Sequence, residues 1–218
     1  MKRLLQALTP GNDLDELDRR GAICDGKDDT EPAYRAMVSW IEALDEARQL
    51  RLMSQLRAWL GPEESVWHQT AAIEIAVRLR DESLMAAAAG EARRRPTGRE
   101  SHFFQLDLVY GVMRFPTLAG KTLLDEWRER MGAASSHEER VIAIRSEVVH
   151  CVVERLGPAC VRNALDEARR SNDSGALHSV VALVFAVARD PEQAVLGLQL
   201  TDAERRLIIA DVPPRATD

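Results

Sequence analysis

The chain has 218 residues, enough for one sizeable domain or an extended repeat array with its own core. A hydrophobic content of 45% and a charged content of 29% are typical of a folded, water-soluble protein and exclude a disordered chain. The net charge of −6 argues against a general nucleic-acid-binding protein, which needs a basic face. Aromatic residues are scarce, whereas Ala, Leu, Arg and Glu are abundant, so the composition favours helices.

Hydrophobic residues spaced by three and four positions predict helices along the chain and no strand. The first 30 residues are expected to form a short helical segment and a polar loop, the loop at 21–30. Residues 31–210 are expected to form one domain of paired helices, and residues 211–218 a flexible tail. The predicted helices of that domain cover 31–44, 46–60, 64–80, 82–95, 99–114, 117–131, 137–155, 158–170, 175–189, 191–199 and 202–210.

Several predicted helix starts carry capping residues. Three S/T-x-x-E capping boxes occur, at Thr97–Glu100, Ser136–Glu139 and Thr201–Glu204. Thr117 is expected to cap the helix that contains Lys121. That helix includes the segment AGKT, which lacks the earlier glycine and the preceding strand of a phosphate-binding loop. We therefore predict no nucleotide site there.

The turns within successive helix pairs are separated by roughly 35 residues, with one gap of about 42, which is the period of helical-hairpin repeats. The second helices also carry similar segments, GEARRR at 90–95, LDEWRER at 124–130 and LDEARRS at 165–171. In period and pattern the chain resembles the HEAT-like α-solenoids over about residues 31–200. The resemblance implies an all-α fold, a right-handed stack of antiparallel helical hairpins. A compact helical bundle is the alternative.

The segment EVVHCVVERLGPAC combines several residues that can hold a metal. Glu147, His150 and Glu154 share one helix face, and Glu-x-x-His is the ligand spacing of ferritin-like di-iron bundles. Those bundles need two copies, and this chain has one, so we expect a solvated stripe without a metal or cofactor. Cys151 and Cys160 are expected to be neighbouring thiols in the core.

Membrane and secretory segments are not predicted. The most apolar stretch, 176–188, has 13 residues, where a membrane-spanning helix needs about 20, so we expect a buried helix. The basic start of the chain is followed by an apolar run too short for a signal peptide. The three cysteines, the third being Cys24, are odd in number and lack C-x-x-C spacing. We therefore expect free thiols and a cytoplasmic location.

Three arginines occupy equivalent positions in the similar segments: Arg93, Arg128 and Arg169. In a solenoid, equivalent positions form a row along one surface. Such a row could bind an acidic partner through bidentate hydrogen bonds. Alternatively, each cation only interacts favourably with the dipole at the C-terminus of its helix.

Three of the four tryptophans are expected in the core: Trp40, Trp59 and Trp127. Trp67 shares a helix face with Glu74 and Arg78, which makes this face a candidate for anchoring a partner; the alternative is that Trp67 simply packs in the fold.

No catalytic motif is assembled, so we predict no catalytic residue, and the leading hypothesis is a non-catalytic protein that binds another protein. Bacterial inhibitors of the immunity type and adaptors belong to this class. The alternative is a DNA-repair enzyme similar to the HEAT-like alkylpurine glycosylases, whose concave face carries Trp and Asp. Trp127 with Asp125 is the nearest such pair, but the acidic net charge disfavours it. A third hypothesis is a carboxylate-bridged metal protein that uses Glu147 and His150.

Overall fold

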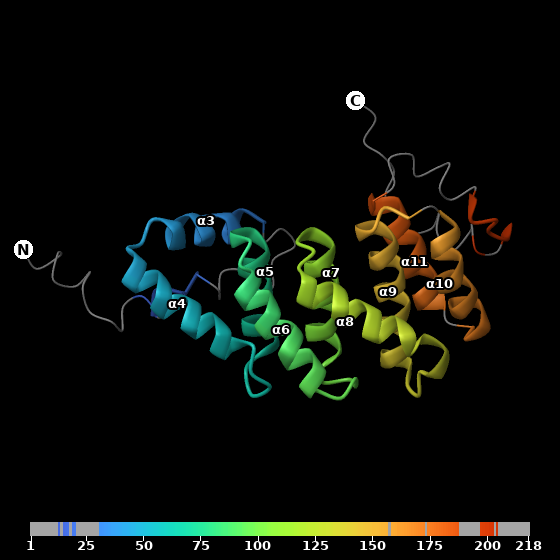
Figure 1. Ribbon diagram of the computed structural model, residues 1–218, viewed down its shortest axis with the longest axis horizontal. Helices are drawn as coiled ribbons and strands as arrows, with labels where there is room; N and C mark the ends of the chain where they lie inside the picture. Colours follow the sequence, from blue (N-terminus) through green and yellow to red (C-terminus); the bar gives the residue numbers. More distant parts are fainter. Residues whose placement is uncertain are drawn as a thin grey trace, which may run out of the picture. The chain divides into compact units, whose positions relative to one another are not determined.

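The computed structural model describes residues 13, 15–17, 19–20, 31–156, 158–172, 174–187, 197–202 and 204. Throughout these residues the fold is all-α, as predicted, and contains no strand (Figure 1). Its elements are α3 (Glu31–Glu42), α4 (Glu46–Trp59), α5 (Val66–Leu79), α6 (Glu82–Arg94), α7 (His102–Arg114), α8 (Leu118–Glu129), the 3-10 helix η1 (Met131–Ala133), α9 (His137–Val153), α10 (Pro158–Arg170) and α11 (Ser174–Val187).

Most predicted helices agree with these elements to within three residues at each end. The predicted helices at 191–199 and 202–210 lie mostly outside the described residues, as do the loop at 21–30 and the tail at 211–218. α3 packs against α4, α5 against α6, and α9 against α10, as the predicted pairing requires.

The chain divides into two compact units. Unit 1 comprises Met1–Pro96 and Phe103–Gly120, and unit 2 comprises Thr97–His102 and Lys121–Asp218. α3 to α6 and nearly all of α7 therefore belong to unit 1. Most of α8 belongs to unit 2, together with α9, α10 and α11.

Capping side chains fix several helix starts. Asp45, Ser65, Asp81 and Ser136 each stand in extended backbone before a helix and accept a hydrogen bond from the backbone N–H three residues on. The Thr201–Glu204 box is complete: Glu204 N donates to Thr201 Oγ1 at 3.3 Å, and Thr201 N donates to Glu204 Oε2 at 2.7 Å. Of these caps, Ser136 and Thr201 were predicted from the sequence.

Two capping boxes differ from the prediction. The Ser136–Glu139 box is made only in part, because the Glu139 carboxylate accepts from Ser135 N at 2.8 Å, one residue before the expected donor. The box at Thr97–Glu100 is wrong, since α7 begins at His102 and residues 97–101 form bends and turns. Within those turns the hydroxyl of Ser101 and the backbone of Gly98 lie 3.3 Å apart and bond to each other instead.

Glycines allow close helix packing within unit 1. A Cβ at Gly111 of α7 would lie 3.0 Å from Ile73 Cγ2 of α5, and one at Gly120 of α8 would lie 2.5 Å from Val112 Cγ2 of α7. Thr117 Oγ1 accepts a hydrogen bond from Gly120 N at 3.2 Å, so Thr117 caps α8 as predicted. Gly120, part of the AGKT segment, is therefore explained by helix packing.

Trp59 and Trp127 lie in the cores of unit 1 and unit 2, respectively, as predicted, with 2% and 5% of their surface exposed. The prediction for Trp40 is wrong, because its ring is only half-buried. The Arg20 guanidinium lies over that ring, 5.0 Å from its centroid, and a cation–π contact of this kind is compatible with partial exposure.

The predicted apolar helix at 176–188 corresponds to α11, which packs against α9 and α10. Ala176, Leu177, Val180 and Val181 are buried there. None of the helices that the structure describes is both long enough and apolar enough to cross a membrane.

Candidate functional site: a polar cleft in unit 2

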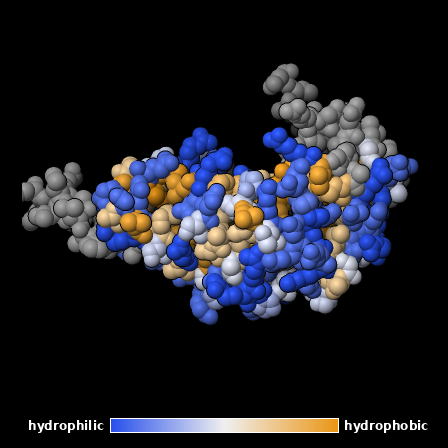
Figure 2. All heavy atoms as spheres, in the orientation of Figure 1, coloured by the Kyte–Doolittle hydropathy of each residue, from blue (hydrophilic) through white to orange (hydrophobic). Residues whose placement is uncertain are grey.

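A cleft of about 680 Å³ opens in unit 2 among α8, α9 and α10. Seven of its nine lining residues are ionisable: Asp125, Arg128, Glu129, Glu147, His150, Asp166 and Arg170, with Met131 and Asn163 completing the set. Hydrophilic residues also predominate on the visible face over α9 and α10 (Figure 2). Small-molecule pockets are mostly lined by apolar and aromatic side chains, so this cleft is of a different kind.

A buried ion pair lies in the cleft wall. Glu147 of α9 is only 4% exposed, and its Oε2 accepts a hydrogen bond from Nε of Arg128 at the end of α8. Arg128 Nη1 also donates to Asp125 Oδ1, at 2.8 Å. Burial alone would lower the pKa of Arg128, but the hydrogen bond to Glu147 leads the contributions that raise it overall. Arg128 is therefore held charged beside the buried carboxylate.

These contacts correct the expectation that Glu147, His150 and Glu154 form a solvated stripe. Only Glu154 is exposed, and it pairs with Lys121 Nζ at 2.7 Å. His150 Nδ1 lies 3.3 Å from Asp125 Oδ1 at the cleft. The three residues share a helix face, but α8 and α10 cover its Glu147 end, which helical spacing alone does not reveal.

The rim of the cleft is acidic. Side-chain exposure reaches 51% for Asp125 and 62% for Asp166, and Glu129 is exposed as well. Arg170 is the exposed cation of the lining, and its Nη2 lies 2.9 Å from Glu167 Oε2 in an ion pair. Four lining carboxylates stand against two lining arginines, so the cleft carries excess negative charge when the carboxylates are ionised. Such an opening attracts cationic groups.

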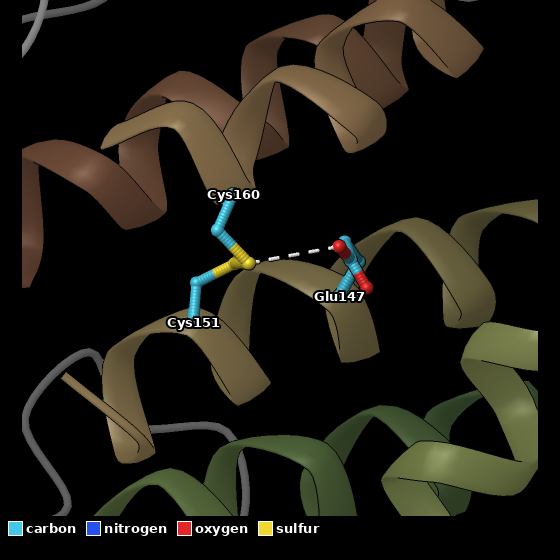
Figure 3. Close-up of side chains that lie close together, drawn as sticks. All are labelled: Glu147, Cys151 and Cys160. Atoms are coloured by element: carbon cyan, nitrogen blue, oxygen red, sulfur yellow. Dashed lines mark hydrogen bonds between the residues drawn. A yellow bond between two sulfur atoms is a disulfide. The ribbon is translucent and has the colours of Figure 1, made fainter. Parts of the chain in front are cut away.

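A disulfide joins Cys151 of α9 to Cys160 of α10, with the two Cα atoms 5.9 Å apart (Figure 3). The predicted free thiols are therefore wrong for this pair. The physical reason is the tight reversal between the two helices: it brings Cα atoms nine residues apart in sequence into disulfide range without any C-x-x-C spacing. Cys24 lies outside the described residues.

Glu147 lies beside the disulfide, with its Oε1 3.7 Å from Cys160 Sγ (Figure 3). A disulfide sulfur carries no proton, so this is a close contact in the oxidised chain. It becomes a hydrogen bond from sulfur to carboxylate when Cys160 is a thiol.

The three predicted arginines all lie in the last turn of their helices, where a cation interacts favourably with the helix dipole. Arg93 is exposed in unit 1, whereas Arg128 and Arg169 belong to unit 2. Arg169 donates to both carboxylate oxygens of Glu204, at 2.7 and 2.8 Å. Arg128 and Arg169 are thus engaged in ion pairs within unit 2.

Two residues of the predicted Trp67 face, Glu74 and Arg78, form ion pairs within unit 1. Arg78 bonds Glu74 on its own helix and Glu31 on α3, and its side chain is only 17% exposed. Arg114 Nη2 of α7 donates to Glu74 Oε1 at 2.7 Å. Glu74 and Arg78 therefore connect α3, α5 and α7.

Trp67 itself is half-buried and packs edge-on against Trp59, with their ring centroids 5.6 Å apart. It is the member of this face that combines partial exposure with a large apolar surface, as an interface anchor requires.

The Trp and Asp pair of the glycosylase alternative is not assembled. Asp125 lines the cleft, but Trp127 is 5% exposed in the core and offers no ring face on which a base could stack.

The chain matches no protein-family model, no curated protein and no solved structure.

Proposed function

We propose that this is a non-catalytic protein-binding protein, and that its unit 2 cleft docks a basic segment of a partner protein. The observation that carries the proposal is the acidic rim of Asp125, Glu129 and Asp166 around an open polar cleft. Carboxylates pair with arginine or lysine of a partner, and a net charge of −6 steers a basic protein toward the chain.

The cleft is expected to bind a partner segment that forms several ion pairs with it, because one exposed ion pair is too weak to hold a partner. Each exposed pair contributes only about 0.2–1 kcal/mol, so a stable complex needs several pairs and additional contact area. Partly exposed Trp67 is a candidate anchor on unit 1, and Arg93 remains a candidate contact. Arg128 and Arg169 support the cleft and its surroundings through their ion pairs.

We further propose that the helix pairs form a HEAT-like stack. Repeat surfaces of this kind serve adaptors and inhibitors. An acidic binding protein suits the inhibition of a basic partner, as bacterial immunity proteins inhibit toxins. Only three of the 29 basic residues are lysine, a bias typical of GC-rich bacterial genomes. A cytoplasmic location remains part of the proposal. Because the cytoplasm is reducing, this location requires that the Cys151–Cys160 disulfide can be reduced.

The proposal is tested with a cleft variant and a matched surface variant. The cleft variant carries Asp125→Asn, Glu129→Gln and Asp166→Asn. The surface variant neutralises three other exposed carboxylates: Glu42, Glu63 and Glu100. Each immobilised chain is incubated with extract of the native host, and bound proteins are quantified by mass spectrometry.

We expect the wild-type chain and the surface variant to retain a basic protein. The cleft variant should retain roughly tenfold less of it or lower still, and a tenfold loss corresponds to about 1.4 kcal/mol of binding free energy. Raising the salt concentration should weaken its retention. Equal retention by both variants would contradict the assignment of the cleft.

A further inference from the structure

Three potential metal ligands converge beside the cleft: Glu147, Cys151 and Cys160. One carboxylate oxygen and the two sulfur atoms all lie within 4.8 Å of one another. Glu147 and Cys151 stand one turn apart on α9, and Cys160 reaches them from the first turn of α10 (Figure 3). Glu147 and Cys151 are buried, and Cys160 is half-buried.

We propose that the reduced chain binds one thiophilic divalent cation, of which Zn²⁺ is the representative, through Glu147, Cys151 and Cys160. Thiolates with a carboxylate form a ligand set that Zn²⁺ accepts, at bond lengths of about 2.0–2.3 Å. Ligand atoms within 4.8 Å of one another can meet around a single ion of that size with small side-chain movements. The site goes beyond partner binding and does not depend on it.

The oxidised and the metal-bound forms exclude each other. A thiol reductant supplies two electrons and two protons, which cleave the S–S bond into two thiols, and the reductant leaves as its own disulfide. Zn²⁺ then replaces the two thiol protons, which pass to solvent, and the sulfurs become thiolate ligands. The disulfide in the structure is the form that cannot bind the ion.

The surroundings fit a bound cation. Two thiolates and the Glu147 carboxylate carry three negative charges, which the two charges of Zn²⁺ and the guanidinium of Arg128 together balance. The bond from Arg128 to Glu147 is the kind of outer hydrogen bond that orients a carboxylate ligand. Since Glu147 lines the cleft, the fourth coordination position can open toward it and take a water molecule. His150 is paired with Asp125 and is left out of the set.

The test uses the full chain with Cys24→Ser, so that Cys151 and Cys160 are its only thiols. The chain is reduced with a phosphine under anaerobic conditions, freed of reductant and titrated with Co²⁺ and then with Zn²⁺. We expect one Co²⁺ per chain with a thiolate-to-cobalt charge-transfer band, which one equivalent of Zn²⁺ removes. The oxidised chain should show no such band. A reduced chain without the band, or a band of equal strength after oxidation, would overturn the proposal.

Single variants assign the ligands. Cys160→Ser should weaken or abolish the charge-transfer band, and Glu147→Gln should keep the band but weaken affinity by roughly tenfold or more. Glu154→Gln, on the same helix but outside the set, should bind as the parent does. Circular dichroism checks folding, and Cys160→Ser decides the test if Glu147→Gln fails to fold. Unchanged affinity in folded Glu147→Gln, or an unchanged band in Cys160→Ser, refutes the three-ligand site.

Discussion

At the scale of single residues, the ion pair of Glu147 and Arg128 links the core of unit 2 to its cleft. The carboxylate is buried, while the Arg128 side chain is 26% exposed and its guanidinium also contacts Asp125 at the rim. A buried charge without its partner keeps its full desolvation cost, so the two partners are not equivalent to surface charges. Their substitution should therefore affect stability more than loss of an exposed arginine.

Arg128→Gln is expected to lower the free energy of unfolding by about 3 kcal/mol, because it leaves the Glu147 carboxylate buried without a cation. The matched variant Arg93→Gln alters an exposed arginine in the same helical position and should change stability by less than about 0.5 kcal/mol. Urea denaturation measures both. Adding Glu147→Gln to Arg128→Gln should restore part of the loss, and equal effects of the two single variants would argue against a buried pair.

The Arg169–Glu204 pair gives a pH-dependent prediction. Hydrogen bonding from Arg169 lowers the pKa of Glu204 from 4.5 to about 2. The unfolded chain therefore binds the proton more readily between these pH values, so stability from this group is complete above about pH 4.5 and is lost toward pH 2. A shift of this size corresponds to about 3 kcal/mol.

Glu204→Gln should lower the free energy of unfolding at pH 7 and reduce its decline below pH 4.5, the usual pKa of Glu204. Glu63→Gln removes an exposed carboxylate of unit 1 and should change stability by less than about 0.5 kcal/mol. Urea titrations at several pH values compare the two variants. Parallel pH profiles for Glu204→Gln and the wild-type chain would contradict the role of the pair.

The sequence indicated that Glu147 and His150 share a helix face, but not that Glu147 is buried. α9 is apolar around most of its circumference, with Ile144, Val148 and Val149 all inaccessible to solvent. Which polar position is covered therefore depends on its neighbouring helices. The disulfide was missed although Cys151 and Cys160 were expected to be neighbours, because the odd number of cysteines and the absence of C-x-x-C spacing favoured free thiols.

At the scale of elements, caps and turns were the most predictable features, because they depend on residues close in sequence. Ser136 and Thr117 were each predicted to cap a helix, and each does so in the structure. The Thr97–Glu100 box failed although its residue types were suitable, because the chain forms turns before α7. A local motif permits a cap, and the surrounding backbone decides whether it forms.

Helix packing in unit 1 gives a prediction at this scale. Gly120→Ala should destabilise the protein by about 1–3 kcal/mol, because the new Cβ would lie 2.5 Å from Val112 Cγ2. Gly90→Ala in α6 meets only Arg94 Nη2, at 3.9 Å, and should stabilise the helix by about 0.5–1 kcal/mol. Thermal denaturation compares the two variants. Unchanged or increased stability of Gly120→Ala would contradict the close approach of Gly120 to Val112.

At the scale of the whole molecule, composition and hydrophobic spacing were sufficient to predict an all-α protein, because helix periodicity is repeated in every segment. The polar cleft was not predicted. Its acidic residues come from α8, α9 and α10, and each of them resembles an ordinary solvated position when its helix is considered alone. Only tertiary packing brings them around one opening. The sequence pattern alone therefore pointed to the arginines of the repeated segments and not to the cleft.

Site-specific photo-crosslinking tests most directly whether the cleft binds a protein. A photoreactive phenylalanine analogue replaces Asn163, an exposed lining residue, and in a second chain it replaces exposed Glu63 of unit 1. Both chains are expressed in the native host and irradiated, and their crosslinked products are identified by mass spectrometry. The proposal predicts a discrete adduct with a basic protein at position 163 and not at position 63. No adduct at 163, or the same adducts at both positions, would contradict it.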